Sequence, residues 1–153
     1  MDLNLNGIKV SVSEPEIAAL VRQRLLAQEP AAVAVFSAPP IGADLDGGLY
    51  AGLTLHDGQP HALVLLPGEH KGIRCQDAVS WAAQQGGTLP SRIDQLVMWQ
   101  NLKAQLQPEW YWSCEQHAGN ESYAWYQHFG YGTQLYYYKN NKLRARAVRR
   151  VVI

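Results

Sequence analysis

The sequence has no excess of either charge and few cysteines. Its 13 lysines and arginines balance 13 aspartates and glutamates over 153 residues, so we expect no global attraction to nucleic acid or to an anionic membrane. Its two cysteines, Cys75 and Cys114, lack CxxC spacing. We expect reduced thiols, with a disulfide only if geometry and compartment both allow one.

Long apolar runs and known catalytic motifs are missing as well. No apolar run approaches the ~20 residues of a membrane helix, so we predict no membrane span. The first ten residues lack a basic segment followed by a long apolar one, which predicts no signal peptide. GxSxG, HExxH, P-loop and dinucleotide motifs are absent, and we predict no cofactor.

The sequence does contain enough apolar surface for a folded domain with a short extension, because 47% of the residues are hydrophobic and five are tryptophans. We predict that residues 1–41 form the extension. Residues 1–10 have the apolar spacing of a short strand, and Ser13 with Glu16 forms a capping box before an amphipathic helix at 14–28. Prolines and a glycine then indicate a linker that ends near residue 42. This extension is a candidate for oligomerisation or assembly.

Residues 42–153 are predicted to form one α+β domain, because strands, two helices and further strands follow one another without βαβ alternation. We expect the first and last strands of this domain to pair. The predicted strands lie at 49–55, 62–66, 110–114, 123–129, 133–138 and 143–151, and the helices at 75–85 and from 92 after a Ser91 cap.

The segment from Tyr123 to Arg150 is the candidate binding region, because tyrosine, glycine and asparagine are typical of binding loops. Strand alternation predicts Trp125 and Phe129 in the core and Tyr126 and His128 facing out. Three consecutive tyrosines cannot all point into one core, so at least one is exposed. The alternative is that these rings pack on neighbouring strands or on a second domain. The candidate ligand-binding residues are Tyr126, His128, Tyr131, Gln134, Tyr136, Tyr137, Tyr138, Asn140 and Asn141.

A family resemblance extends over residues 42–153 and leaves residues 1–41 outside. The stretches that carry it are GGLYAG (47–52), HALVLLPGE (61–69), DAVSWAA (77–83), GGTLPSR (86–92), QNLKAQLQPEWYWSCEQHA (100–118), YAWYQHF (123–129) and RARAVRR (144–150). Together they resemble short phage and prophage proteins that carry a C-type-lectin-like domain of the formylglycine-generating-enzyme-like branch. The resemblance implies a C-type-lectin-like fold and a ligand-binding surface on a rigid scaffold.

Some members of that branch are variable proteins of diversity-generating retroelements, which mutate adenines chiefly in Asn-type codons near the 3′ end of a gene. The resemblance therefore implies that such mutation could have produced the tyrosines, histidine and asparagines at the candidate positions. A tyrosine-rich hairpin that is not diversified has the same residues. The sequence departs from the wider fold in two ways. Gln107-Pro108-Glu109 is only a partial match to a calcium-binding lectin motif, and Cys75 and Cys114 do not match the oxidase cysteine pair. We therefore predict no metal site and no catalytic residue.

Three functional readings follow. We expect a non-enzymatic protein that binds another protein. As a virion-associated adhesin it would bind a bacterial surface receptor. As a cytoplasmic prophage protein it would bind and inhibit a host factor. An enzyme would rely on Glu115 and His117, on one strand face, with His128. Nucleic acid would use the basic C-terminus. We do not expect it, because Arg149 and Arg150 have possible partners in Asp44, Asp46 and Glu109.

Overall fold

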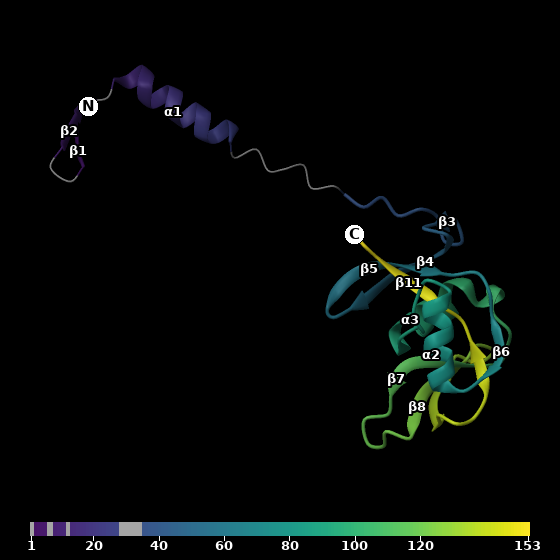
Figure 1. The fold of residues 1–153 in the computed structure, drawn as a ribbon. Helices are drawn as coiled ribbons and strands as arrows, with labels where there is room; N and C mark the ends of the chain where they lie inside the picture. The colour runs from purple at the N-terminus through teal and green to yellow at the C-terminus, as the bar shows by residue number, and fades with distance from the viewer. Residues whose placement is uncertain (1, 6–7, 12, 28–34) are drawn as a thin grey trace. The chain divides into compact units, whose positions relative to one another are not determined.

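The computed structural model describes residues 2–5, 8–11, 13–27 and 35–153 (Figure 1). The chain divides into two compact units, residues 1–35 and 36–153. The sequence placed this boundary at residue 42. Residues 36–41 instead belong to the larger unit, because the Phe36 ring packs 6.4 Å from that of Tyr50 and the Gly42 N–H donates to the Tyr50 carbonyl at 2.8 Å.

The described residues of the smaller unit form two paired strands and a helix. Strands β1 (Asp2–Leu5) and β2 (Ile8–Ser11) pair antiparallel, where the sequence predicted a single strand. Helix α1 (Glu14–Leu26) begins at the predicted capping box, in which the N–H and Oγ of Ser13 donate to the Glu16 carboxylate at 2.9 and 2.7 Å. Leu20, Val21 and Leu25 of this helix are exposed.

The larger unit is an α+β fold with two antiparallel-rich sheets. The four-stranded sheet has the order β11-β5-β4-β3, and the five-stranded sheet has the order β6-β10-β7-β8-β9. The strands are β3 (Asp44–Leu45), β4 (Gly48–His56), β5 (Gln59–Leu65), β6 (His70–Ile73), β7 (Trp110–Gln116), β8 (Tyr123–His128), β9 (Gln134–Tyr138), β10 (Leu143–Ala145) and β11 (Val148–Val152). The helices are α2 (Cys75–Gln84), α3 (Arg92–Leu102) and a 3-10 turn, η1 (Lys103–Gln105).

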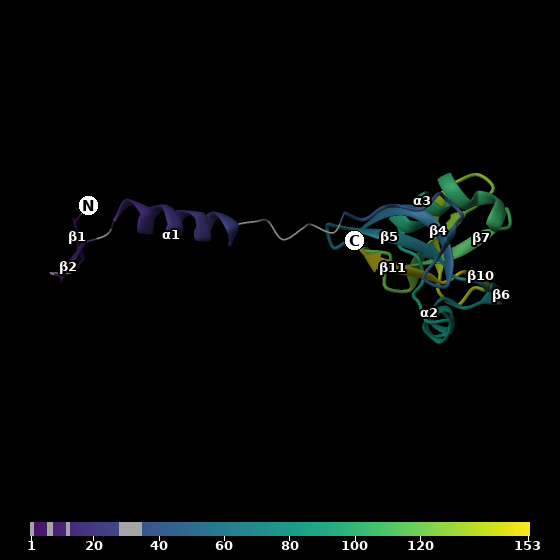
Figure 2. The ribbon, with the colours of Figure 1, turned by 90° about the horizontal axis from the view of Figure 1, so that it is seen from above.

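The strands lie between α2 and α3, which pack on opposite sides of them (Figure 2). Strand β5 and the residue after it are buried on both sides for this reason: Val64 and Leu66 join the core beside α2, and Leu63 and Leu65 join the core beside α3. The short apolar run at 62–66 is the sequence signature of such a strand. The larger unit therefore has two hydrophobic cores, one on each side of the strands.

Two strand predictions were wrong at the C-terminus. The chain forms β10 and β11 in different sheets instead of one strand over 143–151. The break falls at Arg146, whose guanidinium donates to the carbonyls of Gln105 and Leu66 at 2.9 and 3.0 Å. The last strand also pairs with β5 and not with the first long strand, β4.

Candidate functional site

Strands β8 and β9 place most of the tyrosines at one edge of the five-stranded sheet. Strand β9 pairs antiparallel with β8, and its register sets Tyr136 opposite Trp125 and Tyr138 opposite Tyr123. Directly opposed side chains lie on the same face of a sheet. These four aromatic side chains therefore share one face, beside the first residue of α3.

The rings on this face contact one another. The centroids of His117 and Tyr136 lie 4.2 Å apart, those of Tyr123 and Tyr138 4.4 Å, and those of Trp125 and Tyr136 5.3 Å. We call His117, Tyr123, Trp125, Tyr136 and Tyr138 the aromatic face. Mutual packing restrains each ring, while 45% of Tyr136 and 52% of Tyr138 remain exposed to solvent. The aromatic face is thus both ordered and accessible.

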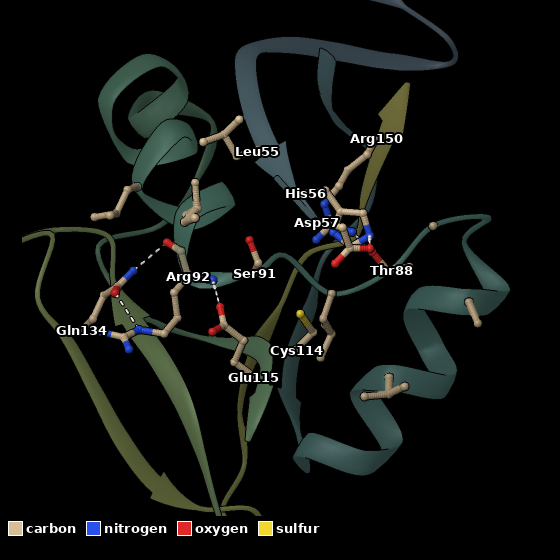
Figure 3. Close-up of a pocket in the computed structure, with 16 residues that line it drawn as sticks. Leu55, His56, Asp57, Thr88, Ser91, Arg92, Cys114, Glu115, Gln134 and Arg150 are labelled. Carbon is tan, nitrogen blue, oxygen red and sulfur yellow. Dashed lines mark hydrogen bonds and ion pairs between the residues drawn. The ribbon is translucent and has the colours of Figure 1, made fainter. Parts of the chain in front are cut away.

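Arg92 packs against the aromatic face through the Trp125 ring. Its guanidinium carbon lies 3.6 Å from the centroid of the Trp125 ring, within the range of a cation–π contact. Its Nε donates to Gln134 Oε1 at 3.0 Å, and its backbone N–H donates to Glu115 Oε2 at 2.5 Å (Figure 3). Arg92 is the first residue of α3, whose predicted Ser91 cap accepts the Asp94 N–H at 3.1 Å. The cap of α3 therefore fixes the position of this contact.

The predicted outward residues of β8 are not on the solvent side. His128 is only 9% exposed, and its ring lies between Trp110 and Tyr131, at 4.5 and 4.6 Å. Tyr126 is half-buried and packs against the core beside α2. The prediction failed because it assigned the two faces of β8 in the wrong phase: Ala124 and Tyr126 face the core beside α2, whereas Trp125 lies on the aromatic face. Phe129 is buried as predicted, whereas Trp125 is only half-buried.

The remaining predicted residues separate into exposed and structural groups. Tyr131 is 78% exposed, and Tyr137 and Asn140 are exposed as well. Gln134 is half-buried, and its side chain is used in internal hydrogen bonds: its Nε2 donates to Arg92 O at 2.8 Å and to Gln127 Oε1 at 2.7 Å. Asn141 closes a turn by donating its N–H to the Tyr138 carbonyl at 3.0 Å.

Sequence reasoning missed four contributors to this surface: Arg92, His117, Tyr123 and Trp125. Tyr123 shares one strand face with Trp125, and the sequence prediction assigned that face to the core. Its hydrogen bond with Tyr138, followed by desolvation, raises the pKa of the Tyr123 phenol. This shift favours the neutral phenol, which can both donate and accept a hydrogen bond.

A cleft of about 760 Å³ lies on the other side of Arg92, between the end of β4, α2 and α3 (Figure 3). Its walls are largely apolar and include Leu55, Val79, Ile93 and Leu96. Cys114 borders the cleft. Part of the residue is exposed, but desolvation by the surrounding groups raises the pKa of its thiol. A raised pKa leaves the thiol protonated and therefore a weak nucleophile.

The polar groups that could support catalysis are engaged in the fold. Glu115 accepts the Arg92 N–H, and His117 Nδ1 accepts the Gly119 N–H at 3.1 Å while its ring packs on Tyr136. Arg150, at the border of the cleft, is paired with the buried Asp94. Within residues 2–5, 8–11, 13–27 and 35–153, no three His, Cys, Asp or Glu residues are grouped as metal ligands.

Comparison with known proteins gives no family for this chain: no family model matches it, and no curated protein matches its sequence. The helices in the described part of the chain are all too short or too polar to cross a membrane.

Proposed function

We propose that this protein is a non-enzymatic binding protein that recognises another protein through the aromatic face, together with Tyr131, Tyr137 and Asn140. The observation that carries the proposal is the exposure of Tyr136 and Tyr138 on the aromatic face, and of Tyr137 on the opposite face of β9, with rings that contact their neighbours. Tyrosine and tryptophan dominate the energetic centres of protein interfaces.

The rigidity of the surface favours binding. An exposed side chain that is already restrained loses little rotamer entropy when a partner docks. Trp125 is fixed between Arg92 and Tyr136, and Tyr123 is fixed between Tyr136 and Tyr138. Each phenol also presents a hydroxyl at the rim of an apolar ring, which suits a partner surface of mixed polarity.

We further propose that residues 36–153 are a C-type-lectin-like domain of phage or prophage origin. Two consecutive helices, α2 and α3, lie between β6 and β7 among mainly antiparallel strands, which is compatible with the fold that the sequence resemblance implies. The partner that fits this origin is a protein receptor on a bacterial surface. The engaged state of Glu115 and His117 favours binding over catalysis as the role of this region.

The proposal is tested by measuring how fluorescently labelled protein binds to a panel of intact bacterial cells, before and after the cells are treated with protease. We expect saturable binding that protease treatment abolishes. Replacing Tyr136, Tyr137 and Tyr138 by Ala should remove it, since each exposed aromatic at an interface centre contributes ~2 kcal/mol, or about 30-fold in affinity.

The matched control replaces three exposed apolar residues outside this surface, Leu53, Leu55 and Val79, by Ala. This control should bind as the wild type does. Equal binding by the tyrosine variant, or binding that survives protease treatment, contradicts the proposal. A large fall in the melting temperature of the tyrosine variant would assign these rings to the core instead.

A further inference from the structure

Strand β9 has one unpaired edge. The Lys139 N–H donates to Ser122 O at 3.0 Å and the His128 N–H donates to Thr133 O at 2.9 Å, so the odd-numbered residues of β9 direct their backbone groups toward β8. Because these directions alternate along a strand, the N–H and C=O groups of Gln134, Tyr136 and Tyr138 point away from the sheet. Within the described residues β9 pairs with β8 alone.

This edge lacks the devices that usually prevent edge-to-edge pairing. Natural sheets protect their edges with prolines, charged side chains, bulges or very short strands. Residues 134–138, Gln-Leu-Tyr-Tyr-Tyr, contain neither proline nor charge, and their register with β8 runs without a shift over five pairs. The edge is therefore a regular template for another strand.

The sequence of β9 is complementary to itself in the antiparallel direction. If a two-fold axis passes through Tyr136, Tyr136 faces its own copy and Gln134 faces Tyr138. The outward N–H and C=O of Tyr136, the Tyr138 N–H and the Gln134 C=O then meet partners, while the Tyr138 C=O already accepts the Asn141 N–H at 3.0 Å. On the opposite face Leu135 faces Tyr137, and each of these residues is 46% exposed. Aromatic–aromatic and aromatic–aliphatic cross-strand pairs stabilise antiparallel sheets.

Charge is also compatible with this pairing. Lys139, the charged residue next to β9, falls opposite Thr133 and not opposite the Lys139 of the other copy. The chain carries a formal net charge of zero at pH 7, so two copies do not repel each other overall.

We propose that the β9 edge pairs with the β9 edge of a second copy of this chain, in antiparallel register about Tyr136. The two five-stranded sheets then form one continuous sheet. The Tyr136 rings of the two copies become neighbours, and the two aromatic faces join into one. This inference goes beyond the proposed function, because it depends only on the edge and not on any other partner.

The first test measures the mass of the full chain in solution by sedimentation velocity over a wide concentration range. We expect the wild type to approach twice the mass of one chain as concentration rises. Tyr136→Pro should stay monomeric because it removes an outward N–H while leaving the β8 ladder intact, and proline is tolerated on the open side of an edge strand. Tyr136→Phe is the matched control and should still associate.

The second test fixes the register and does not depend on a proline variant that folds. In a Cys114→Ser background, which removes the exposed native thiol, cysteines replace either Tyr136 or Leu135. Two copies of residue 136 would have Cα atoms about 5.5 Å apart, which a disulfide can bridge. Two copies of residue 135 would be about 8 Å apart, which is too far. Tyr136→Cys should therefore give an oxidised dimer and Leu135→Cys should not, although both positions are equally exposed.

Each result bears on the inference. A wild type that stays monomeric at the highest concentration overturns it, as does a folded Tyr136→Pro variant that associates like the wild type. Cross-linking at both cysteine positions, at neither, or at 135 alone also overturns it. Cell binding by the aromatic face is a separate measurement, so this inference can fail while the proposed function stands.

Discussion

The buried ion pair between Asp94 and Arg150 gives the most demanding prediction about stability. Asp94 is fully buried, and its carboxylate accepts the Thr54 hydroxyl at 2.6 Å, the Ser91 N–H at 2.8 Å and Arg150 Nε at 3.0 Å. A second contact joins Arg150 Nη2 to the same carboxylate. The pair thereby connects β4, α3 and β11.

We predict that Arg150→Met destabilises the protein by about 3–5 kcal/mol, because it leaves an uncompensated charge inside the fold. The magnitude depends on burial: the Arg150 side chain is 11% exposed and that of Asp94 is 0% exposed, so little solvent screens the charge that remains. Asp94→Asn removes that charge while keeping the shape of the side chain. The double variant should therefore lose less free energy of unfolding than the two single variants added together, by a coupling of about 1–3 kcal/mol.

The assay is urea unfolding of the wild type, both single variants and the double variant, followed by the fluorescence of the five tryptophans. A loss below about 1 kcal/mol for Arg150→Met would refute the reasoning and show that water from the neighbouring cleft screens the carboxylate. Additive losses in the four proteins would show that the two side chains do not interact.

Further predictions concern the cores and the response to alkali. Trp112→Ala should cost about 3–5 kcal/mol of stability in urea unfolding, because Trp112 is fully buried and its Nε1–H donates to Ile73 O at 2.8 Å. Trp125→Ala should cost no more than about 2 kcal/mol, because that ring is half-buried. Equal losses of stability would contradict the different burial of these two rings on β7 and β8. Burial, and then the hydrogen bond to Glu69, raise the pKa of Tyr111 above its ordinary 10.0, so the neutral phenol is favoured in the folded state. Its contribution to stability is complete below pH 10.0 and is lost as the pH rises further, and Tyr111→Phe should flatten this fall in the urea midpoint. An identical alkaline slope in both proteins would argue against a buried neutral phenol.

Local sequence signals predicted most individual elements because each depends on neighbouring residues. The predicted Ser91 cap correctly located the start of α3, and α2 covers nearly the predicted range. The hairpin between β4 and β5 turns at Asp57-Gly58, whose φ angles of 49° and 73° suit the residue types that the sequence supplies there. The predicted pairing of Arg149 with Asp46 is confirmed at 3.1 Å.

Tertiary arrangement was harder to predict because it depends on distant segments. Alternation along β8 separates its two faces, but it does not say which face meets the core, so it cannot identify His128 as buried. The break between β10 and β11 reflects a change of sheet that no local pattern records. Arg150 pairs with Asp94, 56 positions away, and not with the acidic residues considered from sequence. Of the candidate binding surface, the exposed tyrosines of β9 and Tyr131 were predicted, whereas the contribution of Arg92 from α3 was not.

Strands β8 and β9 separate the residues that hold the fold from those that display rings. Ala124, Gln127 and Phe129 are buried, while Tyr131 and Tyr136 to Tyr138 remain accessible. Randomising codons 131, 136, 137, 138 and 140 would therefore leave these core positions unchanged, and exposed substitutions of this kind usually alter stability little. A library built in this way would make the larger unit a scaffold for selecting new specificities, with the same backbone carrying every variant.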